Sequence, residues 1–123
     1  MMLHILDGSA FIHRYYHAYP KLVRADGQPV GAVMGVCEML LRAYERNEWG
    51  HVIVAHDAGR RTFRHVLDKQ YKANRSPPDD ALRSQFALAR RAFEVFGIDA
   101  VEAPGYEADD VIATLVTSLR AKH

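Results

Sequence analysis

Short apolar runs alternate with helix-like patterns along the whole chain, and this alternation restricts the fold to the α/β class. In the helix-like stretches, apolar residues return every three or four positions, which is the spacing of one helix face. The expected strands are residues 3–7, 51–56 and 98–102. The expected helices are a short one that follows a Gly8-Ser9 turn and ends near Tyr19, one over residues 30–47, one over residues 80–97 and a last one after Gly105. This order predicts a parallel sheet flanked by helices.

Acidic residues follow two of the expected strands and begin the last expected helix. Asp7 closes the first strand, and Asp57 follows the second. Glu107, Asp109 and Asp110 lie together after a Pro104-Gly105 turn. In an open parallel sheet, the carboxyl ends of the strands and the adjacent helix starts meet at one edge, where ligands bind. We therefore predict that these five carboxylates, from three parts of the chain, converge on one site.

A cluster of five carboxylates is unfavourable unless a cation lies among them. Carboxylate oxygens suit hard cations, so we expect Mg²⁺ or Mn²⁺. Each acid also has a simpler explanation when taken alone. Acids in a first helical turn complement the helix dipole, and Asp57 could be a loop residue. Asp7 could cap the first helix, although Gly8-Ser9 is the turn and cap that we expect there. The combination favours a metal site.

The basic residues are concentrated in one segment. Residues 60–75 carry a charge of +5, and the rest of the chain carries −4. Tyr71, Lys72 and Arg75 lie within five positions of one another, and these residue types can stack on a base and bind phosphate. A basic segment beside an acidic site favours a polyanion held near a metal, whereas the alternative is a solvated charged loop.

Several other classes of protein are excluded. The chain has no nucleotide-binding glycine motif and no zinc pattern among its histidines, and its single cysteine excludes a disulfide framework. Ser9 lacks a base and an orienting acid for a hydrolase triad, and it also breaks the signature of an aspartyl phosphatase. No apolar run approaches the ~20 residues that cross a bilayer. We expect a cytoplasmic location and no membrane partner.

Eight segments together resemble the 5′-nuclease family, which comprises 5′–3′ exonucleases and flap endonucleases. Within it, the chain is most similar to the N-terminal exonuclease domains of bacterial DNA polymerase I. The segments follow the family order and span nearly the whole chain: Leu6-Asp7-Gly8-Ser9, residues 14–18, residues 27–32, Gly35-Val36, His56-Asp57-Ala58, Thr62-Phe63-Arg64, residues 71–75 and residues 104–111. The last segment is the most specific of them.

The resemblance implies metal-dependent hydrolysis of DNA phosphodiester bonds at 5′ flaps and in nicked or branched duplexes, and removal of RNA primers at RNA–DNA junctions, in replication and repair. It implies a two-metal site of Mg²⁺ or Mn²⁺. The implied metal ligands are Asp7, Asp57, Glu107, Asp109 and Asp110, with Asp110 and Lys72 catalytic. The implied DNA contacts are Arg14, Arg64, Tyr71, Lys72 and Arg75.

The resemblance also implies that residues 1–123 are the N-terminal part of a 5′–3′ exonuclease domain. The family's later metal-binding strands and its helix–hairpin–helix region are expected beyond these residues, so the fold is expected to be truncated and the second metal site incomplete. A fused polymerase is expected in the parent protein. Two alternatives remain open: a catalytically incomplete fragment that only binds DNA, and a PIN-like ribonuclease, which is a related α/β class.

Overall fold

A computed structural model describes residues 2–19, 21–57 and 80–122, and its centre is a parallel sheet. The three strands are β1 (Leu3–Asp7), β2 (His51–Ala55) and β3 (Asp99–Val101), in the order β1-β2-β3. Asp7 lies opposite Ala55, which lies opposite Val101, so the three strands end at nearly the same level. The predicted strands and their parallel arrangement are confirmed, each within one or two residues of its expected bounds.

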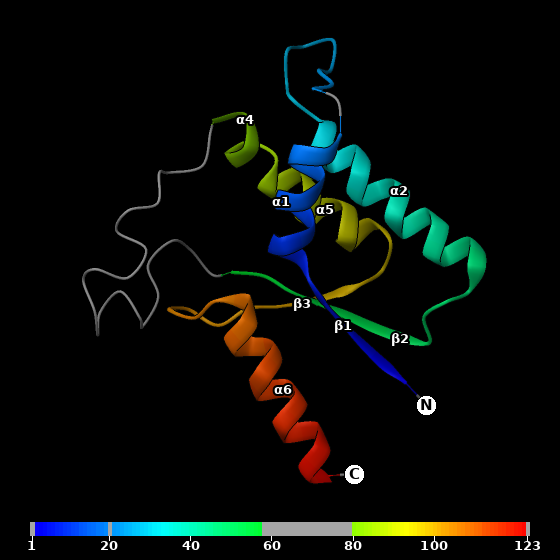
Figure 1. Cartoon of the computed structure of the whole chain (residues 1–123), viewed down its shortest axis with the longest axis vertical. Helices are drawn as coiled ribbons and strands as arrows, with labels where there is room; N and C mark the ends of the chain where they lie inside the picture. The colour runs from blue at the N-terminus through cyan, green and yellow to red at the C-terminus, as the bar shows by residue number, and fades with distance from the viewer. Residues whose placement is uncertain (1, 20, 58–79, 123) are drawn as a thin grey trace.

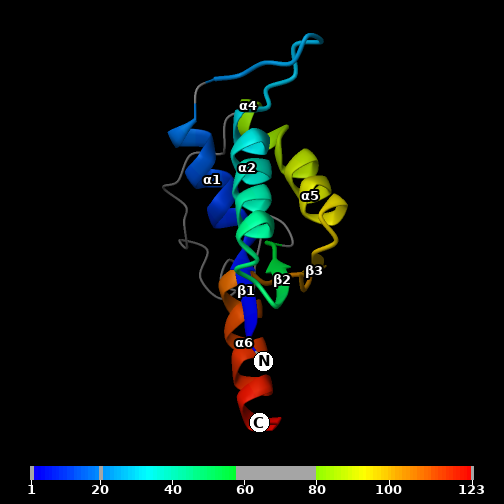
Figure 2. The ribbon, with the colours of Figure 1, turned by 90° about the vertical axis from the view of Figure 1, so that its right-hand side faces the viewer.

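The helices cover the two faces of the sheet unequally (Figure 1). Helices α1 (Gly8–Ala18), α2 (Gly31–Arg46) and α5 (Phe86–Val95) lie on one side, whereas α6 (Ala108–Lys122) lies on the other. The view turned by 90° shows α6 extending away from the sheet beyond its first turns (Figure 2). In the part of the chain that the structure describes, no helix is long and apolar enough to cross a membrane.

The hydrophobic core lies between the sheet and the three helices on its larger side. Every helix of that layer contributes side chains, and β2 contributes from the sheet. The buried residues include Ile12, Val36, Leu40, Val54, Leu82 and Phe93. This burial supplies the driving force for the layer to form. This packing also fixes the start of α1 and the loop that follows β2, where the predicted acids Asp7 and Asp57 lie.

The helix expected over residues 80–97 is broken in the structure. A short α4 (Asp80–Arg83) precedes α5, and Gln85 lies between them. In a continuous helix the carbonyl oxygen of Ala81 would accept from the backbone N–H of Gln85. Here the Gln85 side-chain amide donates to that carbonyl at 2.9 Å, and the backbone N–H of Gln85 donates to Leu82 O instead. The side chain thus competes with the helical hydrogen bond, which the apolar periodicity does not reveal.

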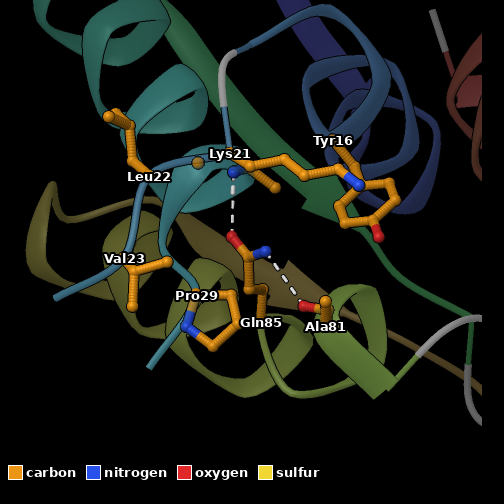
Figure 3. A pocket seen from close by; sticks show the side chains of 9 residues that line it. Tyr16, Lys21, Leu22, Val23, Pro29, Ala81 and Gln85 are labelled. Carbon is orange, nitrogen blue, oxygen red and sulfur yellow. Dashed lines mark hydrogen bonds between the residues drawn. The ribbon is translucent and has the colours of Figure 1, made fainter. Parts of the chain in front are cut away.

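The same glutamine caps a different helix. The first N–H groups of a helix have no partner within it, and Val30 at the start of α2 provides no side-chain cap. Gln85 Oε1 accepts from the N–H groups of Ala32 and Val33, at 2.8 and 3.2 Å. Figure 3 shows this side chain among the residues that line a pocket. The volume of the pocket is about 150 Å³. The pocket lies at the far end of α1 from Asp7 and is lined mainly by apolar side chains.

Substitution of Gln85 by alanine is expected to destabilise the fold by about 1–2 kcal/mol, because two N–H groups at the start of α2 lose their acceptor. Urea unfolding followed by circular dichroism measures the change. Ser84→Ala is the matched control, because Ser84 is the exposed neighbour of Gln85, and it should change stability by less than about 0.5 kcal/mol. Equal stability of the two variants would show that the glutamine cap contributes nothing.

Candidate metal centre

The first acid, Asp7, is both the last residue of β1 and the N-cap of α1. Its Oδ1 accepts from the backbone N–H of Ala10 at 3.0 Å. The cap is therefore Asp7, and the expectation that Gly8-Ser9 would supply it is wrong. A carboxylate is well suited to this position, because it satisfies one of the unpaired N–H groups and complements the positive end of the helix dipole. The helix thus begins at the strand end, which fixes Asp7 at the carboxyl edge of the sheet.

The second acid, Asp57, lies two residues beyond β2 and is held by three other segments. Its N–H donates to Ser9 Oγ at 3.2 Å, at the start of α1. Its carbonyl oxygen accepts from Arg90 Nη2 at 2.7 Å, from α5. Its Oδ1 accepts from the N–H of Ala108 at 2.7 Å, the first residue of α6. Asp57 therefore joins the starts of α1 and α6 at the carboxyl edge of the sheet.

The remaining three acids surround the start of α6. Tyr106 N–H donates to Ala103 O at 3.0 Å, which closes the predicted Pro104-Gly105 turn. Gly105, the third residue of this turn, has φ +84°. Residues with a side chain disfavour this conformation, whereas glycine adopts it readily. Glu107 immediately precedes the helix, and its N–H donates to Asp110 Oδ2 at 3.1 Å. This is the reciprocal half of a capping box, so Asp110 also stabilises the helix start.

Asp7, Asp57 and Asp109 are brought close enough to influence one another. The pKa of the Asp7 carboxyl is raised above its usual range, first by burial and then by the negative charges of Asp109 and Asp57. Asp109 is also within hydrogen-bonding reach of Asp7. We call these three residues, with Glu107 and Asp110, the acidic edge. Part of the predicted convergence is therefore visible in the fold, with Asp7, Asp57 and Asp109 at its centre.

The donor set of the acidic edge fits a hard divalent cation. Carboxylate oxygens are the ligands that Mg²⁺ and Mn²⁺ prefer. Burial and then the nearby negative charges raise the pKa of Asp7, and a bound cation would relieve the repulsion between these charges. The backbone hydrogen bonds of Asp7, Asp57 and Asp110 each use one of the two carboxylate oxygens. Within the described residues, however, no group of three or more His, Cys, Asp or Glu side chains is arranged so that it could hold a metal ion.

Buried beneath the acidic edge is His56, which precedes Asp57 and is only 2% exposed. Its ring packs edge-on against Phe93, and neither ring nitrogen has a hydrogen-bond partner among the described residues. Burial, and after it the positive charge of Arg90, lowers the pKa of His56 to about 4. The imidazole is therefore neutral at physiological pH and packs as a core side chain.

Three residues at this edge were not predicted from the sequence: Ser9 as a partner of Asp57, Arg90 and Glu102. Glu102 directly follows β3, as Asp7 ends β1, so the same strand-end pattern was available as a signal. Arg90 Nη2 donates to Glu102 Oε2 at 3.0 Å. Because α5 shows only an amphipathic pattern, its sequence gives no indication that Arg90 reaches Asp57.

The predicted DNA-contacting residues are only partly placed. Arg64, Tyr71, Lys72 and Arg75 lie outside the described residues, so their predicted roles stay predictions. Arg14 lies on the exposed side of α1, with its guanidinium carbon 5.7 Å from the centroid of the Phe11 ring. This cation–π contact holds the positive charge at the surface of α1.

Comparison with protein families gives one match over nearly the whole chain. The model of the 5′-3′ exonuclease, N-terminal resolvase-like domain matches residues 2–123. The DNA polymerase I of Rhizobium leguminosarum is 44% identical over 127 residues, which cover 97% of this chain and 12% of that protein. The 5′-3′ exonuclease of Aquifex aeolicus is 36% identical over 120 residues, which cover 98% of this chain and 42% of that protein.

A solved structure supports the same relationship. The T5 D15 protein co-crystallized with metal ions superposes with a TM-score of 0.63 at 26% identity, over 94% of this chain and 43% of that chain. The three-stranded parallel sheet with flanking helices is thus the architecture shared with that protein. The chain spans less than half the length of each of these relatives.

Proposed function

The chain belongs to the family of 5′-3′ exonuclease N-terminal, resolvase-like domains, and on this basis we propose that it carries metal-binding carboxylates of a structure-specific 5′ nuclease. The proposed reaction is hydrolysis of DNA phosphodiester bonds at 5′ flaps, nicks and branches, and removal of RNA primers. The proposed setting is replication and repair.

One observation carries the proposal: three carboxylates from separate elements meet at the carboxyl edge of the sheet. Asp7 comes from the end of β1, Asp57 from beyond β2 and Asp109 from the first turn of α6. Both of the other charges raise the pKa of Asp7. Structural capping accounts for each acid singly, but it does not account for three acids brought together against their mutual repulsion.

In the proposed centre, Asp7, Asp57, Glu107, Asp109 and Asp110 hold Mg²⁺ or Mn²⁺. When bound, such ions lower the pKa of an attacking water and stabilise charge that builds on the phosphate. One carboxylate oxygen of Asp7 and one of Asp57 each accept from a backbone N–H, which orients each side chain. Lys72 and Arg75 are proposed to contact the phosphate of the scissile nucleotide, Tyr71 to stack near the terminal base, and Arg14 and Arg64 to bind neighbouring phosphates.

The relatives suggest a larger setting for this chain. It covers 12% of a DNA polymerase I and 42% of a 5′-3′ exonuclease. We therefore infer that residues 1–123 correspond to the front of an exonuclease domain, whose later strands and helix–hairpin–helix region would supply further metal ligands and a duplex clamp. A polymerase fused to the parent protein belongs to the same proposal.

The direct test is cleavage of a labelled 5′-flap DNA by this chain in Mg²⁺, with EDTA as the metal-free control. Metal-dependent cleavage supports the proposal. Absence of cleavage by a chain whose folding is verified by circular dichroism would contradict catalysis by these residues alone. Salt-sensitive DNA binding without cleavage would then identify the chain as a binding fragment.

Variants of Asp110 separate chemistry from folding in this test. Asp110→Ala should abolish cleavage but leave DNA binding largely intact, because the residue is proposed to bind metal rather than DNA. Since Asp110 also accepts from Glu107 N–H, Asp110→Asn is the companion variant, which keeps an acceptor and loses the charge. Wild-type cleavage by either variant would contradict the assignment of Asp110. A matched RNA flap distinguishes the PIN-like ribonuclease, which would cleave it in preference to DNA.

A further inference from the structure

We propose that Arg90 is a positioning residue for Asp57, and that Glu102 holds Arg90 in place for this purpose. The inference rests on the proposed function, because it assigns to Arg90 the task of presenting a metal-binding carboxylate. Arg90 and Glu102 both lie at the carboxyl edge of the sheet, and neither is one of the five acids predicted from the sequence. Arg90 is in α5, and Glu102 is the first residue after β3.

Asp57 needs such a device because it lies beyond the last ladder position of its strand. The sheet register ends at Ala55, and one further bond, from His56 N–H to Val101 O at 3.0 Å, extends the pairing of β2 with β3. The direction of the next peptide unit is then set by the bonds to Asp57 itself. Among these, the hydrogen bond from Arg90 Nη2 to the Asp57 carbonyl oxygen, at 2.7 Å, is the one that fixes the carbonyl side of Asp57.

Arg90 is itself held at both ends. Its backbone belongs to α5, where the neighbouring Ala89 and Phe93 are fully buried. At the other end of its side chain, Nη2 donates to Glu102 Oε2 at 3.0 Å as well as to Asp57. An exposed ion pair contributes little to stability, and these side chains are 40% and 46% exposed. The pair therefore matters for geometry: it joins the end of β3 to the peptide that follows β2.

The effect reaches the carboxylate through the Asp57 backbone. With its N–H held by Ser9 and its carbonyl held by Arg90, Asp57 can direct Oδ1 to the N–H of Ala108. Without the hydrogen bond from Arg90, the Asp57 carbonyl is no longer held. The Asp57 carboxylate then has no fixed position relative to the N–H at the start of α6. Residues that orient metal ligands typically change metal affinity by about 10–100-fold when they are removed.

The neighbouring residue provides a matched control. Arg91 is also in α5, carries the same charge and forms an ion pair with Glu94 at 2.8 Å, but its side chain is 66% exposed. Arg91→Ala therefore removes a cation and an ion pair from the same helix without touching Asp57. Arg90→Lys is the rescue variant, because lysine keeps a charged donor but has a shorter reach and lacks the guanidinium fork.

The experiment measures Mn²⁺ uptake by the whole chain from the electron paramagnetic resonance signal of free Mn²⁺, and amide hydrogen exchange at Ala108 by NMR. In Arg90→Ala we expect Mn²⁺ affinity to fall roughly tenfold or more and the Ala108 amide to exchange faster. Arg90→Lys should recover part of both losses, and Arg91→Ala should match the wild type. If Arg90→Ala does not fold, Arg90→Lys and Glu102→Gln are used in its place, with smaller losses expected.

The outcomes separate the two proposals. A wild-type chain that takes up no Mn²⁺ overturns the proposed metal chemistry. A wild-type chain that binds Mn²⁺ with the same affinity as Arg90→Ala, with unchanged exchange at Ala108, overturns only the positioning role. Unchanged Mn²⁺ affinity combined with weaker DNA binding in EDTA would also overturn it, because Arg90 would then be a phosphate contact. Equal losses of Mn²⁺ affinity in Arg90→Ala and Arg91→Ala would show that the loss comes only from removing a positive charge. This result would also overturn the positioning role.

Discussion

Replacing Asp7 with asparagine is expected to remove most metal-dependent cleavage while the fold stays intact. Asparagine is as good an N-cap as aspartate, so its Oδ1 can still accept from Ala10 N–H. The substitution removes the negative charge that would hold the cation. A metal contributes several kcal/mol of transition-state stabilisation, so the cleavage rate should fall on the order of a thousandfold. Single-turnover cleavage of a 5′-flap DNA measures the rate, and a Mn²⁺ titration measures the loss of binding.

Two companion variants make this result specific. Asp99→Asn removes a charge from the exposed first residue of β3, at the opposite edge of the sheet, and should leave cleavage and Mn²⁺ binding unchanged. Asp7→Ala removes both charge and cap, so it should lose activity and about 0.5–2 kcal/mol of stability. Wild-type cleavage and Mn²⁺ affinity in Asp7→Asn would show that Asp7 serves only as a helix cap.

Substitution of Gly35 by alanine is expected to destabilise the fold by about 2–3 kcal/mol, because it forces apart two helices that pack closely. A Cβ atom at Gly35 of α2 would lie 2.5 Å from Cγ and 2.6 Å from Cβ of Tyr15 in α1. The Cβ of Tyr15 is attached directly to its backbone, so a rotamer change cannot relieve the clash. Relief requires α1 to move, and α1 begins directly after its N-cap, Asp7. Urea unfolding, followed by fluorescence of the single tryptophan, Trp49, measures the loss of stability.

Gly50→Ala is the control for Gly35→Ala. A Cβ atom at Gly50 would meet only the backbone oxygen of Met2, at 3.6 Å, which is an ordinary contact. Its stability should stay within about 0.5 kcal/mol of the wild type. A Gly35→Ala protein as stable as Gly50→Ala would show that the α1–α2 contact can relax at no cost.

The elements of this fold could be predicted from sequence because their signals are local. The β1 and β2 runs are short and apolar, and the stripe through Leu82, Ala89 and Phe93 has the helical period and is buried. The turn at Pro104-Gly105 needs a glycine with positive φ and has one. The meeting of strand ends could also be predicted, because parallel topology places them at one edge.

What could not be predicted depends on side chains that act over long sequence separations. The Gln85 side chain interrupts a periodic helix and caps α2, and the Arg90 side chain extends from an amphipathic helix to the Asp57 carbonyl. Neither residue type has a spacing that identifies such a contact. The assignment of the cap of α1 was wrong for a related reason. Ser9 and Asp7 are both good caps, and Ser9 is engaged by Asp57 instead.

The contacts that hold Asp57 also bear on the order in which the chain folds. Its three partners are 48, 33 and 51 residues away in sequence. Contacts of such separation form only after the entropy of closing long loops has been overcome, which makes them slow relative to local helix formation. Helices α1 and α2 can associate with fewer intervening residues. We therefore expect the edge around Asp57 to form after α1 and α2 have packed together, so protection of the Ala108 amide during refolding reports a late step of folding.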